Sequence, residues 1–242
     1  MSTDSNVITV SDIRIEIVRK DIKNVHLSVN PPEGRVRLSV PHHITDDSVR
    51  LAVVSRLAWI KKRQDEFKNQ PRQSERHYVT GESHFYKGKR YILEVVERKG
   101  KHEVELRSNA KMRMYVSPGT SLENRALVLE RWYRSNLKVD IASLLEKWLP
   151  DIGKRVTFWG VKRMKTKWGS CNTSEARIWI NSELAKKSPE CLEYILVHEL
   201  VHLHERHHND RFLNLMEKLL PVWRHRRDML KREPLAHEDW EY

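Results

Sequence analysis

The sequence contains very little cysteine. Of its 242 residues, only Cys171 and Cys191 carry a thiol. Two cysteines do not make a disulfide framework, and their scarcity fits a reducing compartment. No stretch approaches the roughly 18 uninterrupted apolar residues of a membrane-spanning helix. The opening residues, "MSTDSNVITVSD", also lack the basic start and apolar run of a signal peptide. We therefore expect a cytoplasmic protein with no membrane partner.

Acidic residues are scarce relative to basic ones. The chain has 33 Asp and Glu against 45 Lys and Arg, which gives a formal net charge of +12. A basic surface favours polyanions through counterion release and electrostatic steering, so nucleic acid is a candidate partner. The basic residues are spread over the whole chain, however, which weakens the case for one defined groove. The alternative is a solvated surface with an excess of Lys and Arg.

The first part of the chain predicts strands and one helix. Residues 7–41 alternate apolar and polar side chains, and "PPEG" at 31–34 marks a turn. A helix follows, capped by Thr45 or Asp46, with apolar positions as far as Ile60. The polar, proline-containing residues 69–76 predict a connection. The strands of residues 84–116 then read as an antiparallel meander.

Helical periodicity begins after the second group of strands. Thr120 and Glu123 have the spacing of a capping box, and Pro150 stops the pattern. A strand pair is expected within residues 154–181. Ser188 followed by Pro189 begins the next helix, with a hydroxyl cap before a proline in the first turn. We find no internal repeat and no low-complexity segment.

A H-E-x-x-H motif lies on the helix that begins at Ser188. His198 and His202 are four residues apart, so they share one helix face and can bind one ion. Zinc suits neutral imidazole, and a catalytic zinc site keeps one position open for water. Glu199, directly after the first histidine, can act as the general base for that water. A histidine-rich surface helix is the alternative, but the surrounding residues are apolar.

A third ligand requires the helix to end soon after the motif. His204 points away from the metal face if the helix continues, and so do His207 and His208. The helix must therefore end near residues 205–207. Asn209 and Asp210 are good caps for a new helix, so His208 can fold back to the metal and His207 is its neighbouring alternative. Glu205 lies on the ligand face but about 10 Å along the axis, so it is expected either to support the ligands or to be solvated rather than to bind the ion.

Several motifs together resemble a known family. "VHELVHLHERHHNDRF", preceded by "KWGSCN" and "IWINSEL" and followed by "LPVW", is similar to the YgjP-like metallopeptidases. These are minimal zincins, related to the SprT and WLM groups, and the likeness extends over most of the chain. The resemblance implies that His198, His202 and His208 bind zinc and that Glu199 is the catalytic glutamate. It also implies a peptide or protein substrate.

The "KWGSC" segment has two interpretations. Its small residues suggest a close backbone approach, and zincins generally bind an extended peptide along an edge strand near the metal. Trp168–Ser170 and the strand Arg177–Ile180 are candidates for that rim, or the segment is a turn packed beneath the helix. Cys171 is a candidate metal ligand or inhibitory thiolate, but a small buried side chain is the simpler interpretation. Cys191 is expected in the core.

Two further predictions concern other large side chains. Arg226 and Arg227 could reach a substrate carboxylate or phosphate, although a solvated basic helix end is the simpler interpretation. Four scattered tryptophans are expected to pack rather than to bind. These are Trp132, Trp148, Trp159 and Trp223.

The sequence thus predicts an α+β protein. Residues 1–118 are expected to form a β-rich N-terminal region with one helix, and residues 119–242 a compact zincin-like catalytic region with the metal on a helix pair. The expected activity is zinc-dependent hydrolysis with one zinc ion, most simply of a peptide bond. Two rivals are a metal-dependent hydrolase of nucleotides or other phosphoesters and a zinc-stabilised nucleic-acid-binding module. The oligomeric state is not predicted.

Overall fold

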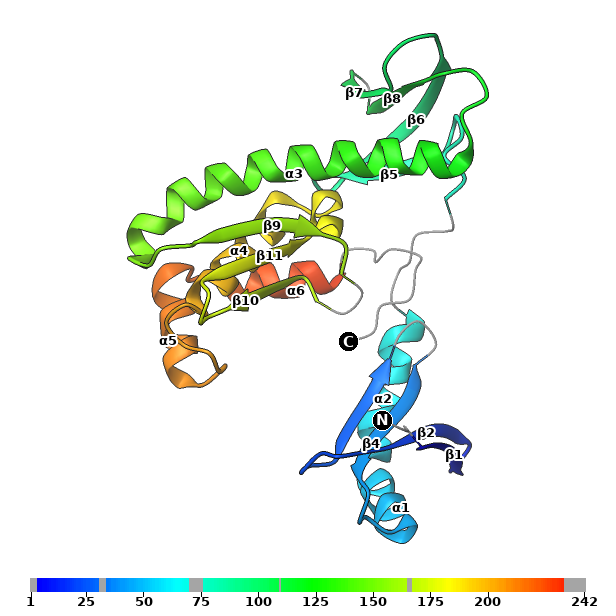
Figure 1. The fold of residues 1–242 in the computed structure, drawn as a ribbon, viewed down its shortest axis with the longest axis vertical. Coiled ribbons are helices and arrows are strands. Elements are labelled where there is room, and N and C mark those ends of the chain that lie inside the picture. Colours follow the sequence, from blue (N-terminus) through cyan, green and yellow to red (C-terminus); the bar gives the residue numbers. More distant parts are fainter. Residues whose placement is uncertain (1–3, 31–33, 70–75, 109, 165–166, 233–242) are drawn as a thin grey trace. The chain divides into compact units, whose positions relative to one another are not determined.

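The chain folds into two compact units. The computed structural model describes residues 4–30, 34–69, 76–108, 110–164 and 167–232. Each unit has its own apolar core of strands and helices, and the division falls within residues 70–75, outside the described ranges (Figure 1). The α+β class predicted from the sequence is confirmed. Among the described helices, none combines the length and apolar character needed to cross a membrane.

The first unit is a four-stranded sheet with two helices. Its elements are β1 (Asp4–Val10), β2 (Ile13–Lys20), β3 (His26–Asn30), β4 (Arg35–Pro41), α1 (Asp46–Val54) and α2 (Leu57–Asn69). The strand order is β1-β2-β4-β3. Thr45 caps α1, since its Oγ1 accepts a hydrogen bond from the Ser48 amide at 3.3 Å. The one predicted helix is two, because the chain turns between them at Ser55 and Arg56. Ile15, Leu38 and other alternating residues fill the core.

The second unit begins with a sheet of the same order. Its strands are β5 (Ser83–Tyr86), β6 (Lys89–Glu97), β7 (Glu103–Arg107) and β8 (Lys111–Val116), arranged β5-β6-β8-β7. The predicted meander is therefore wrong. The chain places β7 at the far edge and returns β8 between β7 and β6, so the central pair β6/β8 is parallel.

These two sheets repeat one design, although the sequence showed no repeat. In each, the central strand pair is parallel and both outer pairs are antiparallel. Positive φ angles occur at the same places, in the first hairpin turn and before the fourth strand, and a hydroxyl caps the helix that follows. These positions form matched pairs, and in every pair the residue of the second sheet follows its counterpart in the first sheet by the same number of residues. The pairs are Ser11 and Lys87, Asp12 and Gly88, Gly34 and Ala110, and the caps Thr45 and Ser121.

The rest of the second unit packs around one long helix. Its elements are α3 (Leu122–Ile152), β9 (Phe158–Lys162), β10 (Gly169–Asn172), β11 (Arg177–Asn181), the 3-10 turn η1 (Ser182–Lys186), α4 (Pro189–Val201), α5 (Asp210–Leu219) and α6 (Trp223–Arg232). The sheet order is β10-β11-β9, so β10 is an edge strand. It pairs antiparallel with β11, which pairs parallel with β9.

The ends of α3 differ slightly from the prediction. Ser121, one residue after the predicted Thr120, caps the helix by accepting from the Asn124 amide at 3.3 Å. Pro150 does not stop the helix, which continues to Ile152. Gly153 then ends it with φ of 62°, a left-handed conformation that glycine adopts at low cost.

The structure divides the chain earlier than residue 118. The hairpin turn of β5 and β6 docks on η1, where the Lys87 amide donates to the Ala185 carbonyl at 2.9 Å. The Tyr133 hydroxyl of α3 donates to the Phe85 carbonyl at 2.8 Å. Residues 83–116, assigned to the N-terminal region from the sequence, therefore share a core with the helices that follow.

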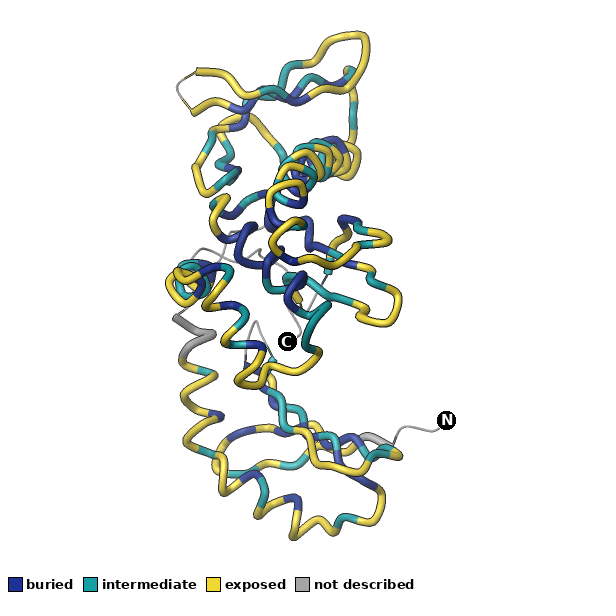
Figure 2. The backbone as a smooth tube through the Cα atoms, turned by 90° about the vertical axis from the view of Figure 1, so that its left-hand side faces the viewer, coloured by how far each residue is buried: buried dark blue, intermediate teal, exposed yellow. Residues whose placement is uncertain are grey.

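Glu193 joins three helices of the second unit. This buried carboxylate of α4 accepts hydrogen bonds from Lys147 Nζ at 2.6 Å and Trp148 Nε1 at 3.0 Å, both on α3. It also accepts from Arg226 on α6. Loss of one partner from such a cluster is costly, because a buried donor or acceptor that is left unpaired has no water molecule to bond to instead. Dark-blue, buried stretches of the tube gather in the interior of this unit in Figure 2, and nearly all residues of α4 are buried.

We expect Glu193→Ala to lower the free energy of unfolding by about 2–3 kcal/mol, because it leaves the buried Trp148 indole N–H and the mostly buried Arg226 guanidinium without their acceptor. Burial alone would raise the pKa of Glu193, but hydrogen bonds from Lys147 and Arg226 lower it overall. The carboxylate therefore stabilises the fold above its ordinary pKa, and this contribution is lost as pH falls through the lowered value. Glu193→Gln should accordingly lose less stability than the wild type between about pH 5 and pH 3.

Urea unfolding at several pH values tests both statements. Glu146→Ala, an exposed carboxylate on α3, is the matched control and should change stability by less than about 0.5 kcal/mol. Equal losses in Glu193→Ala and Glu146→Ala would show that the cluster contributes nothing special.

Candidate metal centre

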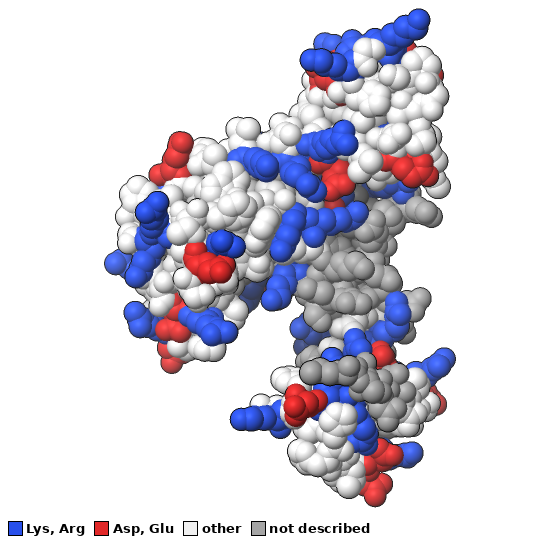
Figure 3. All heavy atoms as spheres, in the orientation of Figure 1, with Lys and Arg blue, Asp and Glu red and all other residues white. Residues whose placement is uncertain are grey.

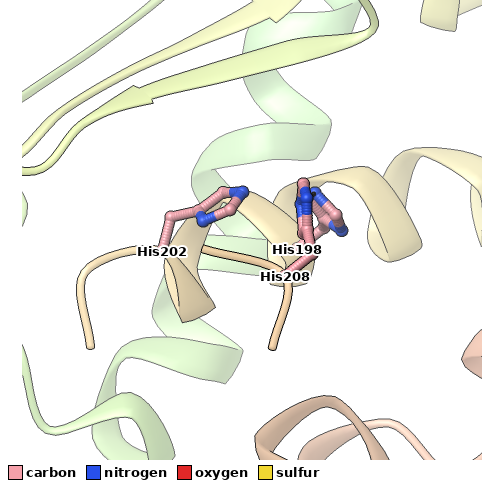
Figure 4. Close-up of side chains that lie close together, drawn as sticks. All are labelled: His198, His202 and His208. Carbon is pink, nitrogen blue, oxygen red and sulfur yellow. Dashed lines mark hydrogen bonds between the residues drawn. The ribbon is translucent and has the colours of Figure 1, made fainter. Parts of the chain in front are cut away.

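Three histidines meet at the end of α4. Their ring nitrogens, one each from His198, His202 and His208, all lie within 4.8 Å of one another (Figure 4). His198 and His202 are partly buried, whereas His208 is exposed. The Nε2 atoms of His198 and His208 are 3.0 Å apart. The structure thus brings together the three residues that the sequence singled out.

The helix ends earlier than predicted, and this brings His208 back. The last α-helical residue is Val201, not a residue near 205. The amides of His204 and Glu205 both donate to the Val201 carbonyl, at 2.9 and 3.1 Å, so the chain tightens and turns. Asn209 then caps α5, as predicted, because its Oδ1 accepts from the Phe212 amide at 3.1 Å.

His204 and His207 lie outside the cluster. The only acceptor in reach of His204 Nε2 that the structure records is the Ile152 carbonyl, 2.7 Å away at the end of α3, so this ring donates there. The bond also satisfies a carbonyl that the helix end leaves without an internal partner. His207 is exposed, and its amide donates to Glu205 Oε1 at 3.2 Å. These positions agree with the interpretation of His208 as the third histidine.

Phe212 forms the floor of the cluster and was not anticipated from the sequence. Its ring centroid lies 4.9 Å from that of His198, 4.8 Å from His202 and 4.7 Å from His208. The side chain is 2% exposed. A buried ring in contact with all three imidazoles restricts their rotation, so the cluster is held before any ion arrives.

Burial and hydrogen bonding set the imidazoles in the form that binds metal. Burial, followed by the neighbouring His202 and His208, lowers the pKa of His198 to about 3. Burial also lowers the pKa of His202, whose Nδ1 lies 3.0 Å from the Glu205 carbonyl oxygen. Because that oxygen can only accept, Nδ1 carries the proton and Nε2 keeps its lone pair. Glu205 therefore supports the site through its backbone.

A set of three imidazoles fits a zinc ion with one open position. The set contains no carboxylate, which argues against magnesium or calcium as its ion. Cys171 does not belong to it. Burial, followed by the charge of Glu199, raises the pKa of the Cys171 thiol to about 11, so it is protonated at neutral pH. Cys191 is buried beside Ser188, whose Oγ lies 3.2 Å from its Sγ.

Glu199 is sealed against the edge strand. The residue is 5% exposed, and burial raises the pKa of its carboxyl to about 8, although the charge of Lys167 works in the opposite direction. A Cβ atom added at Gly169 would lie 2.5 Å from Glu199 Oε1 and 2.8 Å from its Cδ. No such contact is tolerated, so β10 can approach the carboxyl only with glycine at this position.

Asn181 holds the segment that leads to Gly169. Its Nδ2 donates to the carbonyls of Met164 and Lys167, each at 2.8 Å, and its backbone amide donates to the Trp168 carbonyl at 2.9 Å. The side chain is fully buried. Asn181 therefore fixes where β10 begins. The close approach inferred for "KWGSC" is present, whereas no sequence pattern pointed to Asn181.

The remaining candidates have structural surroundings. Arg226 donates a hydrogen bond to the Glu193 carboxylate. Arg227 lies with its guanidinium 5.2 Å from the Trp223 ring centroid. Trp148 and Trp223 belong to the core, and Trp132 and Trp159 pack against it, so all four tryptophans pack as expected.

A family model described as "YgjP-like, metallopeptidase domain" matches residues 23–233. Among solved structures, the chain is similar to the metallopeptidase zymogen of Pyrococcus abyssi abylysin. That match has 21% identity, 39% coverage of this chain, 99% coverage of the other and a TM-score of 0.35, too low to carry an argument. No curated protein matches the chain.

We expect Gly169→Ala to displace Glu199 or β10, because the new methyl group has no room. Overpacking of this kind costs about 1–3 kcal/mol. Ser170→Ala is the control, since Ser170 is the next residue on the same strand and points to the opposite face of the sheet. Thermal unfolding of both variants tests the contact, and an unchanged melting temperature for Gly169→Ala would contradict it.

Proposed function

The chain belongs to the YgjP-like metallopeptidase family, and on that premise we propose that it is a zinc-dependent peptidase with Glu199 as its general base. The observation that carries the proposal is the juxtaposition of a three-histidine cluster with a buried, adjacent carboxyl that takes no part in the cluster. A purely structural metal site has no use for such a carboxyl. The substrate class is peptides or proteins.

His198, His202 and His208 would hold the ion. Zinc in such a site supplies Lewis acidity, which lowers the pKa of a water molecule toward neutrality and polarises a carbonyl. Glu199 accepts the proton of the attacking water on a carboxylate oxygen and passes it to the nitrogen of the leaving amine. The Glu205 carbonyl keeps His202 in one tautomer, and Phe212 holds the three rings in place.

The base form of Glu199 depends on its surroundings. With a pKa raised to about 8 by burial, its carboxyl is mostly protonated at neutral pH in the metal-free protein. A cation held by the three histidines would favour the charged form of Glu199, so metal loading and activation of the base would be linked in one site.

The two rival functions are separated by substrate. Phosphoester hydrolysis at the same histidines is the alternative suggested by the net charge, and a zinc-stabilised nucleic-acid-binding module is the other. Release of peptides from casein supports the peptidase. Zinc-dependent turnover of nucleoside triphosphates without peptide release would support the phosphoesterase, and turnover of neither would support the module.

The role of Glu199 can be tested with a near-isosteric substitution. Glutamine is nearly isosteric but cannot accept a proton, so Glu199→Gln should retain about one zinc per chain while hydrolysis falls by roughly 100-fold or more. The wild-type carboxyl has a folded pKa above its unfolded value, which destabilises the metal-free fold increasingly as pH rises between the two. Metal-free Glu199→Gln should therefore melt no lower than metal-free wild type at pH 7.

Zinc stoichiometry, melting temperature and turnover, measured in parallel, decide the role. Full activity in Glu199→Gln would exclude the base mechanism whatever the metal content. Loss of zinc would instead place Glu199 among the ligands.

The proposed role of His208 as the third metal ligand can be tested in the same way. His208→Ala should lose zinc and activity, because two imidazoles alone hold the ion weakly. His204→Ala is the matched control: it removes a histidine four positions away whose ring bonds to Ile152, so it should keep zinc and lose only some stability. Zinc analysis after dialysis checks both, and the opposite pattern would overturn the assignment of His208.

A further inference from the structure

The sheet β10-β11-β9 carries two aromatic rings on the face away from α4. Phe158 of β9 and Trp179 of β11 have ring centroids 5.2 Å apart. Both cover Gly160, because a Cβ there would lie 2.6 Å from Trp179 Cζ3 and 3.2 Å from Phe158 Cε1. Glycine at position 160 thus leaves room for the two side chains to meet over the strand.

Strand alternation places these rings on the outside of the sheet. Val161, Ile178 and Ile180 point to the opposite face and are buried in the core. Phe158 is 44% exposed, and Trp179 is partly exposed. Gly169 and Cys171 face Glu199 on the inner side, so the ring pair and the candidate metal centre lie on opposite faces of one sheet.

The same segment is strongly basic. Residues 154–168, "KRVTFWGVKRMKTKW", contain six Lys and Arg and no acidic residue. Lys162 Nζ lies 4.5 Å from the Trp179 ring centroid. Among the described residues no carboxylate is within ion-pair distance of Lys162, whereas Arg177 on the neighbouring strand pairs with Glu175 at 3.3 Å. Figure 3 shows Lys and Arg side chains gathered over β9 and the adjoining part of α3.

We infer that this face binds single-stranded nucleic acid, with bases stacking on Trp179 and Phe158 and a backbone phosphate contacting Lys162. Single strands expose the faces of their bases, and proteins bind them by combining aromatic side chains with a positively charged path. The net charge of +12 supplies the long-range attraction. A protein partner would need a wider apolar area than two rings bordered by Lys162.

This binding does not depend on the proposed peptidase chemistry, because its residues take no part in the metal centre. The test measures fluorescence anisotropy of a labelled oligothymidylate on the full chain at about 50 mM salt, a concentration at which phosphate contacts are little screened. The wild type should bind the single strand more tightly than a duplex of equal length. Trp179→Ala should weaken binding by about tenfold, as expected for loss of one stacked base.

Matched variants separate stacking from simple charge. Trp179→Phe retains a ring and should keep most of the affinity. Phe158→Ala removes the more exposed ring and should also weaken binding, so the proposal does not depend on one variant folding. Trp59→Ala is the control, because Trp59 is 42% exposed and lies beneath Arg63 at 5.9 Å in the other unit. It should bind as the wild type does.

The salt dependence gives a second readout. Lys162→Gln should reduce the slope of log affinity against log salt by about 0.7, the value for one phosphate contact on a single strand. Trp179→Ala should leave the slope unchanged. No binding by the wild type, equal affinity for the duplex, or wild-type affinity in both ring variants would each overturn the inference. Melting temperatures confirm that the variants compared are folded.

Discussion

The metal centre depends on where α4 stops. His198 and Glu199 lie within the last turn of a helix whose other side chains are almost all buried, while His208 approaches from the turn beyond it. If the helix continued, His208 would point away from His198. The tight turn after Val201, the Asn209 cap and the ring of Phe212 together return the chain to the helix end. The position of His208 depends on that turn.

Local spacing was sufficient to single out His198, His202 and Glu199 as candidates. Residues four apart share a helix face in any helix, so His198 and His202 follow from sequence, and Asn209 marks the next helix. The position of the helix end could not be derived in this way. Neither glycine nor proline marks it, and part of what fixes it is the bond from His204 to the Ile152 carbonyl, which joins residues far apart in sequence. Gly169, Asn181 and Phe212 were missed or only hinted at for the same reason.

The strands were similarly easier to place than to pair. Alternating apolar residues indicate which segments are extended, but they do not say which neighbour a strand chooses, so the parallel pairs β2/β4 and β6/β8 were not foreseen. The repeated design escaped notice because different residues meet the same backbone requirement. Gly34 and Ala110 both adopt positive φ, and Thr45 and Ser121 both cap a helix with a hydroxyl. The matched positions share a backbone conformation or a capping role, but not a residue type.

The sheet β10-β11-β9 of the second unit has two different surroundings, one on each face. On its inner face, Gly169 lets β10 press against Glu199, which excludes water and raises the pKa of that carboxyl to about 8. On its outer face, Gly160 lets two rings lie across β9. Both glycines have ordinary backbone angles, so their role is space rather than conformational freedom. The two glycines of this three-stranded sheet thus leave room for a buried carboxyl on one face and for an aromatic surface on the other. Substitution at either glycine should therefore disturb only the face that it serves.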